Sequence, residues 1–111
     1  MQNGYLHLIA KQRDEILGMA TFSLKGGFGG GAYLELMIVH QNARNLGIGA
    51  QLLQRYEEYT SESRGGWFAL TEVTNTGGQR FYKRYGHTVV GTLDGFAGPG
   101  RSDLVLFKAR K

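Results

Sequence analysis

The chain has 111 residues and a mass of 12.3 kDa, of which 41% are hydrophobic and 12% aromatic. This length allows one domain, residues 1–111, and the composition supplies a hydrophobic core and argues against disorder. The net charge of +4 favours an anionic partner, and the absence of cysteine excludes disulfides, thiolate metal sites and a cysteine nucleophile.

The first third of the chain shows the apolar alternation that is typical of β-strands. Residues 5–11 and 16–24 predict the two strands of a hairpin, joined by a turn at residues 12–15. Glycine-rich residues 26–31 then lead to Ala32–Val39, which is almost entirely apolar. This composition predicts a central strand that is buried on both faces.

From Leu46 onward the apolar residues recur at helical spacing, which predicts a long helix that Gly65 ends. A second, short helix is predicted to begin at a capping residue, Asn75, and to stop at Gly86. The remaining three strands are predicted over residues 67–73, 87–93 and 104–108.

The predicted order is strand, strand, strand, helix, strand, helix, strand, strand. The long helix connects strand 32–39 to strand 67–73, so these two strands are expected to run parallel in a central βαβ crossover. Strands 5–11 and 16–24 form a hairpin, and strands 87–93 and 104–108 are joined by the loop 94–103. We therefore expect an α/β (α+β) fold with a mixed, mostly antiparallel sheet.

Two glycines open the long helix directly after the apolar strand ends at Val39. Gly47 and Gly49 let the backbone approach an anion closely, and the free N–H groups and the dipole of the helix attract it. Residues 36–56 contain no carboxylate, although acidic residues normally enrich the first turn of a helix. The sequence predicts an anion site beside Arg44, although a tight strand-to-helix turn explains the glycines equally well.

The segment 44–49 (RNLGIG) resembles Arg-x-x-Gly-x-Gly, the acyl-CoA pyrophosphate motif of the GNAT N-acetyltransferase superfamily. A second segment, Asn75 followed by residues 81–87 (FYKRYGH), resembles the Asn…(Leu/Phe)-Tyr-x-Lys-x-Gly-Phe pattern of the same family. The resemblance extends from Tyr5 to the C-terminus. It implies a GNAT-like fold and an enzyme that transfers acetyl from acetyl-CoA to a primary amine by direct attack in a ternary complex.

The resemblance also implies which residues hold acetyl-CoA. Ile38 and Val39 would pair with the pantetheine amides and polarise the thioester carbonyl, and Asn75 would hydrogen-bond the pantetheine arm. Strands 32–39 and 67–73 would splay apart to admit the cosubstrate. The pyrophosphate would lie on the backbone N–H groups of Leu46, Gly47, Ile48, Gly49 and Ala50, beside Arg44 and Asn45.

Acetyl transfer needs a neutral amine, an oxyanion stabiliser and a proton for the leaving thiolate. Glu35 is the predicted base, because burial in its apolar strand would raise its pKa. Glu72 or a water chain is the alternative base. The structural alternative for Glu35 is that it pairs with a neighbouring strand or faces solvent. Tyr82 would lie by the sulfur and protonate the thiolate, since a tyrosine pKa of ~10 lies above the ~8.5 of a thiol. Packing beside Phe81 is the structural alternative for Tyr82.

Two features depart from the family pattern. His87 stands where the family usually has phenylalanine, and the chain opens at what resembles the second strand of the family, without the strand and two helices that form much of the acceptor pocket. A partner chain could supply the missing wall, so we expect a homodimer. The amine acceptor is not identified by the sequence.

Two other functions stay open at this point. One is a non-catalytic acyl-CoA-binding module of the same fold, and the other, ranked lower, is a small basic nucleic-acid-binding domain. The basic residues that would serve the second are Arg80, Lys83, Arg84, Lys108, Arg110 and Lys111. The three histidines lack metal-ligand spacing, so no metal is expected. With no signal peptide or membrane helix visible, we expect a cytoplasmic protein without membrane contact.

Overall fold

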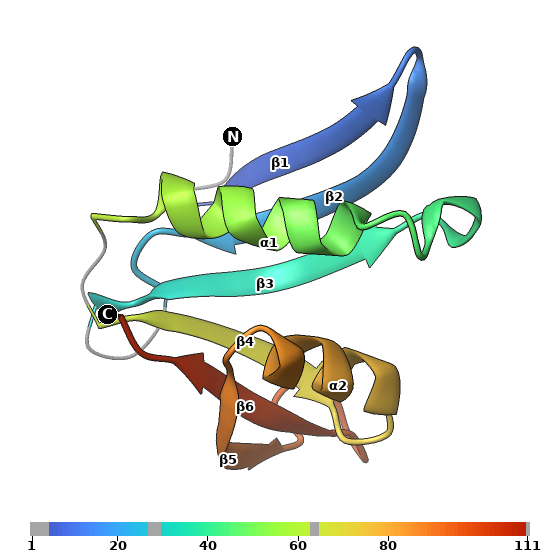
Figure 1. The fold of residues 1–111 in the computed structure, drawn as a ribbon. Helices are drawn as coiled ribbons and strands as arrows, with labels where there is room; N and C mark the ends of the chain where they lie inside the picture. The colour runs from blue at the N-terminus through green and yellow to red at the C-terminus, as the bar shows by residue number, and fades with distance from the viewer. Residues whose placement is uncertain (1–4, 27–29, 63–64, 111) are drawn as a thin grey trace.

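The computed structural model describes residues 5–26, 30–62 and 65–110. Across these residues, six strands form one sheet in the order β1-β2-β3-β4-β6-β5, and two helices pack on one of its faces (Figure 1). The strands are β1 (Tyr5–Gln12), β2 (Glu15–Ser23), β3 (Ala32–Val39), β4 (Trp67–Glu72), β5 (Thr88–Asp94) and β6 (Ser102–Lys108). The helices are the short 3-10 turn η2 (Gln41–Ala43), α1 (Ile48–Tyr59) and α2 (Thr76–Arg84). The predicted α+β class and element order are confirmed.

The connection of β3 through α1 to β4 is the predicted parallel crossover, and the other paired strands are antiparallel. β3 and β4 pair only from Ala32 opposite Trp67 to Leu34 opposite Ala69. Beyond these three residue pairs the strands separate, as the sequence predicted. The separation leaves the second half of each strand without its neighbour on that side.

The core lies between the sheet and α1. Phe22 of β2 is 1% exposed, and its ring meets that of Tyr56 from α1 edge-on at 5.1 Å between centroids. Leu52 and Leu53 of α1 are buried beside it, because the apolar residues of this helix share one face. Burying aromatic and leucine side chains in this way supplies the main driving force for folding.

The prediction that strand 32–39 is buried on both faces is wrong for its second half. Leu34 is 2% exposed, whereas Leu36 is 41% and Ile38 is 50% exposed, and Glu35 lies at the surface. Leu36 and Ile38 alternate with Met37 and Val39, which pack under the helices, so they point to the face that no helix covers. In addition, β4 leaves β3 after Leu34, so this half of β3 has no neighbour on that side.

The long helix also ends earlier than the sequence predicted, at Tyr59 rather than near Gly65. Thr60 is 1% exposed, and its Oγ1 donates to the carbonyl of Tyr56 at 2.7 Å. The same oxygen accepts a hydrogen bond from Trp67 Nε1 at 2.7 Å. This contact with the next strand stops the helix, a tertiary interaction that helical periodicity does not report.

The predicted N-cap of α2 is confirmed. The capping contact leaves no room for a side chain at one of the two glycines that follow it. Asn75 Oδ1 accepts a hydrogen bond from the N–H of Gly78 at 2.9 Å. A Cβ on Gly78 would lie 2.7 Å from Asn75 Nδ2 and 2.8 Å from Thr71 Oγ1, whereas a Cβ on Gly77 would have no heavy atom nearer than 3.9 Å. Only Gly78 is therefore required by its surroundings.

Replacing Gly77 with alanine is expected to raise the free energy of unfolding by about 0.5–1 kcal/mol, because alanine loses less backbone entropy in a helix. Replacing Gly78 with alanine is expected to lower it by about 1 kcal/mol, since the added methyl displaces the capping side chain. Urea unfolding of the two variants measures both changes. Changes of the same sign and size would contradict this account of the helix start.

Candidate functional site

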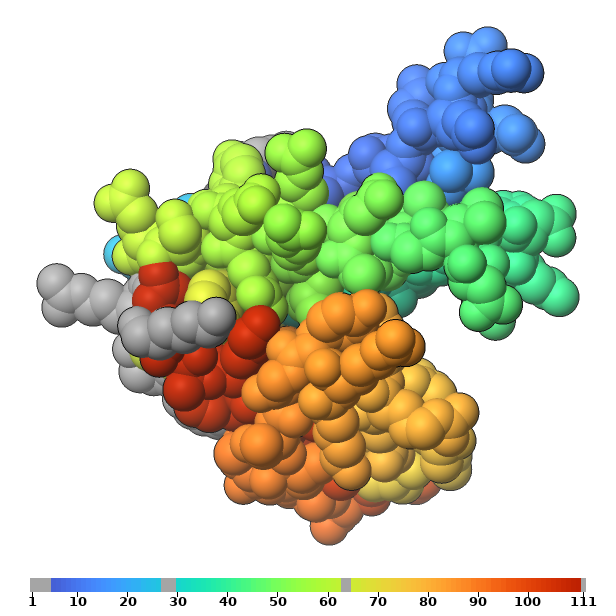
Figure 2. Space-filling model, viewed as in Figure 1, coloured from blue at the N-terminus to red at the C-terminus, as the bar shows by residue number. Residues whose placement is uncertain are grey.

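A cleft of about 810 Å³ opens where β3 and β4 separate. Its walls come from these two strands, the segment that leads into α1, and α2, with Arg101 from the loop before β6. The space-filling view shows the surface hollowed between the segment entering α1 and the residues of β4 and α2 (Figure 2). The cleft therefore lies at the point where the predicted anion turn and the predicted short helix meet.

The N-terminus of α1 opens at the edge of this cleft. Gly47 is its N-cap with a φ of +77°, and no side chain caps the helix there. The first turn also contains no acidic residue. Arg44 and Asn45 line the cleft beside it. Uncapped N–H groups, the helix dipole and a guanidinium together favour an anionic group at this end.

Gly49 brings the two helices together at the cleft. A Cβ there would lie 3.3 Å from Cε1 of Phe81 in α2 and 3.8 Å from Cγ2 of Val39. The glycine thus allows the ring of Phe81 to pack against the first turn of α1. Phe81 packs in turn against Tyr85 at 5.1 Å between ring centroids.

The cleft passes from the helix-covered face of the sheet to the opposite face. Ala32 and Leu34 of β3 pack in the core under the helices, and so do Met37 and Val39. Because side chains on a regular strand alternate between faces, β3 must carry one extra residue between Leu34 and Met37. The register shift opposite Thr21 marks this bulge. The bulge changes which residues of β3 face the helices.

On β4, alternation assigns neighbouring residues to different faces. Thr71 lies against α2, within reach of Gly78. Glu72 therefore points to the face without helices, where it is opposite Asp103 of β6 in register. Both residues line the cleft, with Thr71 at its helix-covered end and Glu72 at the opposite end.

Tyr82 lies in the wall of the cleft and is 7% exposed. Its ring packs edge-on against Phe81 at 5.4 Å and against His87 at 5.2 Å between centroids. Burial, and then the neighbouring Tyr33, raises the pKa of Tyr82 above its usual value. Its hydroxyl therefore stays protonated at neutral pH and is a weaker acid than a free tyrosine.

The predicted burial of Glu35 is wrong, because its side chain is exposed at the mouth of the cleft. Its carboxylate lies near two tyrosines of the face without helices. The charge of Glu35 raises the pKa of Tyr5, and burial followed by the charge of Glu35 raises that of Tyr33 to about 12.

The cleft brings together most of the predicted site residues and leaves others outside. Those that line it are Glu35, Val39, Arg44, Asn45, Gly49, Asn75 and Tyr82, with the alternative base Glu72. Those that do not line it are Ile38, Leu46, Gly47, Ile48 and Ala50. Ile38 is near the end of β3, Leu46 and Gly47 lead into α1, and Ile48 and Ala50 belong to its first turn.

Sequence reasoning missed an ion pair at the base of the cleft. Asp103 is completely buried and accepts hydrogen bonds from Arg101, at 2.9 Å from Nη2 and 3.2 Å from Nε. The Arg101 side chain is 46% exposed and lines the cleft. The spacing of the two residues in the sequence could have indicated this ion pair, because residues two apart lie on the same face of an extended chain.

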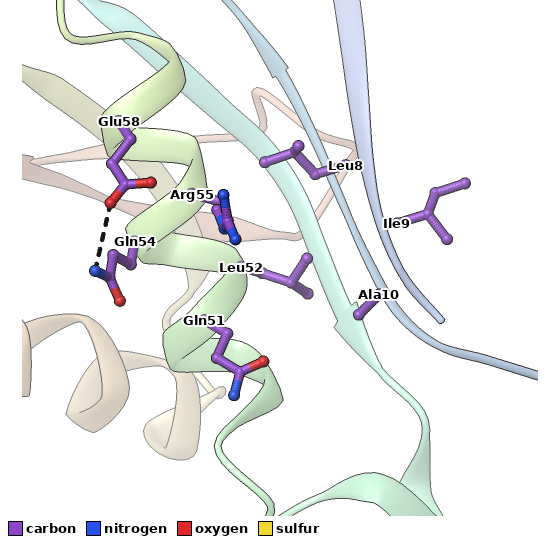
Figure 3. Close-up of a pocket in the computed structure, with 8 residues that line it drawn as sticks. All are labelled: Leu8, Ile9, Ala10, Gln51, Leu52, Gln54, Arg55 and Glu58. Atoms are coloured by element: carbon purple, nitrogen blue, oxygen red, sulfur yellow. Dashed lines mark hydrogen bonds between the residues drawn. The ribbon is translucent and has the colours of Figure 1, made fainter. Parts of the chain in front are cut away.

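A second hollow of about 760 Å³ lies between β1 and α1 (Figure 3). Leu8, Ala10 and Leu52 form its apolar part, and a 3.4 Å hydrogen bond from Gln54 Nε2 to Glu58 lies along the helix. It contains none of the predicted site residues. In the described part of the chain, no cluster of three or more metal-ligating side chains occurs, and neither helix could span a membrane.

Comparison with known proteins gives a family and a fold. The model of the acetyltransferase (GNAT) family matches residues 1–87. No curated protein matches significantly.

Three solved structures illustrate the fold. A protein assigned to the GNAT family from Desulfovibrio desulfuricans has a TM-score of 0.79 and 24% identity over 93% of this chain and 67% of its own. A protein assigned as a streptothricin acetyltransferase from Bacillus anthracis, in complex with acetyl coenzyme A, has a TM-score of 0.82 and 20% identity over 99% of this chain and 65% of its own. The ribosomal-protein-S18-alanine N-acetyltransferase of Escherichia coli has a TM-score of 0.78 and 14% identity over 100% of this chain and 74% of its own. This chain thus spans about two thirds to three quarters of their lengths.

Proposed function

Because the chain belongs to the GNAT acetyltransferase family, we propose that it transfers acetyl from acetyl-CoA to a primary amine by direct attack in a ternary complex. The observation that carries this proposal is the cleft between β3 and β4, with the uncapped N-terminus of α1 at its edge and Tyr82 in its wall. Direct attack is proposed because the sequence contains no cysteine that could form a thiol acyl-enzyme.

Residues on the helix-covered face fit acetyl-CoA. The N–H groups of the first turn of α1, beside Arg44, would hold the pyrophosphate, because they are uncapped and no carboxylate opposes them. The amide of Asn75 and the strand end at Val39 would position the pantetheine arm, since both line the cleft. The gap between β3 and β4 would admit the arm without displacing a strand.

Residues on the opposite face would handle the amine. An amine has a pKa near ~10.4 in water, so it must lose a proton before it attacks the thioester. Glu35 and Glu72 both line the cleft, and either could accept that proton directly or through water. The Tyr82 hydroxyl would donate a hydrogen bond to the leaving thiolate, the role that fits its raised pKa.

We also propose that the chain forms a homodimer. β1 is at the edge of the described sheet, and its edge has no paired strand. Ile9 and Ile16 on the terminal hairpin are 51% and 55% exposed. An unpaired edge beside exposed apolar side chains favours association with a second copy.

A thermal shift assay tests the cosubstrate site. Acetyl-CoA and CoA are each expected to stabilise the wild-type chain by about 2.7 kcal/mol at a hundredfold excess over Kd, and ATP much less. Replacing Gly47 with glutamate is expected to abolish this shift, because it adds a negative charge at the helix N-terminus.

Gly95 provides the matched control for this substitution. Both glycines have a positive φ, +77° and +74°, and a Cβ on either would have no heavy atom within 4 Å. Gly95→Glu therefore introduces the same backbone strain and charge away from the cleft, and it is expected to keep the shift. A folded wild-type chain that CoA does not stabilise would overturn the proposed function.

A further inference from the structure

The two ends of the cleft carry opposite charges. On the helix-covered face, Arg44 and Arg80 line it, and no carboxylate lies in the first turn of either helix. On the opposite face, Glu35 of β3 and Glu72 of β4 line it from two sides of the strand gap. A phosphate-bearing molecule and an amine would therefore be attracted to different ends.

The guanidinium of Arg101 at the acidic end is held chiefly by a third carboxylate, that of Asp103, and Glu72 attracts it more weakly. Arg101 donates side-chain hydrogen bonds to Asp103, the completely buried carboxylate beneath it. Among the described residues, neither Glu35 nor Glu72 belongs to an ion pair. Three carboxylates thus face one guanidinium, so this end keeps an excess of negative charge although Glu35 also accepts a hydrogen bond from Tyr5.

We propose that the amine acceptor is a compound with at least two amino groups, and this inference rests on the proposed function. One ammonium pairs with one glutamate while the reacting amine lies beside the other. A monoamine leaves one carboxylate unpaired. An acceptor with a carboxylate of its own is repelled by both, unless Arg101 binds it.

Three acceptors of similar length distinguish these cases: 1,4-diaminobutane, n-pentylamine and 4-aminobutanoate. With saturating acetyl-CoA, kcat/KM for the diamine is expected to be about tenfold higher than for the monoamine, and lowest for the amino acid. Equal values for diamine and monoamine, or a preference for 4-aminobutanoate, would overturn the proposal.

Substitutions assign the preference to the cleft. Glu35→Gln or Glu72→Gln is expected to bring the diamine-to-monoamine ratio close to one, whichever of them holds the second ammonium. Glu62→Gln changes the net charge equally at an exposed position outside the cleft, and it is expected to keep the ratio. A ratio that survives in both cleft variants would contradict the assignment.

A binding measurement separates this proposal from the proposed function. Titration calorimetry, with and without saturating CoA, is expected to show that 1,4-diaminobutane binds about tenfold more tightly than n-pentylamine. If CoA stabilises the chain but the two amines bind equally, the acceptor proposal is wrong and the proposed function stands. If CoA does not bind and the diamine still does, the proposed function is wrong and the acidic amine site remains.

Discussion

Lowering the pH from 7 to 4 is expected to reduce the free energy of unfolding by about 3 kcal/mol through His87. Burial, and then the charge of Lys108, lowers the pKa of His87 to about 4. The residue is 3% exposed, and its Nδ1 has no hydrogen-bond partner. A proton on this imidazole would place an unpaired charge in the core beside Tyr82.

The direction follows from proton binding in the two states. In the unfolded chain histidine titrates near ~6.5, so between this pH and about 4 the unfolded state binds more protons than the folded state. The stability contributed by neutral His87 is fully present above pH ~6.5 and is lost as the pH falls to about 4.

Urea unfolding at several pH values between 7 and 4 measures this effect. His87→Phe is expected to remove most of the loss, because a phenylalanine keeps the ring contact with Tyr82 and cannot be protonated. His40→Asn removes an exposed histidine and is expected to keep the wild-type pH dependence. If His87→Phe loses stability as steeply as the wild type, His87 is not the group responsible.

Tyr82→Phe is expected to lower kcat by about a hundredfold and to change the KM for acetyl-CoA by less than about twofold. The substitution removes only the hydroxyl, so the ring contacts with Phe81 and His87 remain. Its burial keeps the hydroxyl protonated, so the loss is expected to be constant across neutral pH.

Tyr85→Phe is the matched control for this variant. Tyr85 follows the same helix and packs against Phe81, but it does not line the cleft. The kcat of the Tyr85→Phe variant is expected to stay close to that of the wild type in steady-state assays with an amine that the enzyme accepts. Full activity in Tyr82→Phe would leave Tyr82 a packing residue, and would favour water as the proton donor to the thiolate.

The sequence by itself determined the features that depend on neighbouring residues. Strand alternation and helical spacing placed all six described strands and both longer helices, with shifts of a few residues at their ends. The glycine turn at residues 44–49 and the Asn75 cap were also predictable, because a positive φ and a cap are satisfied within one turn of the chain. These local features positioned the anion end of the cleft.

Only the tertiary structure decided which strands cover which residues. Glu35 is exposed because β4 leaves β3 after Leu34, and no periodicity within β3 encodes where its neighbour departs. Glu72 and Asp103 face each other through the register of β4 and β6, which lie far apart in the sequence. The burial of Asp103, and with it the clustering of carboxylates at this end of the cleft, follows from that register. The end of the cleft at the N-terminus of α1 is thus encoded locally, whereas the end with Glu35 and Glu72 depends on strand pairing between distant segments.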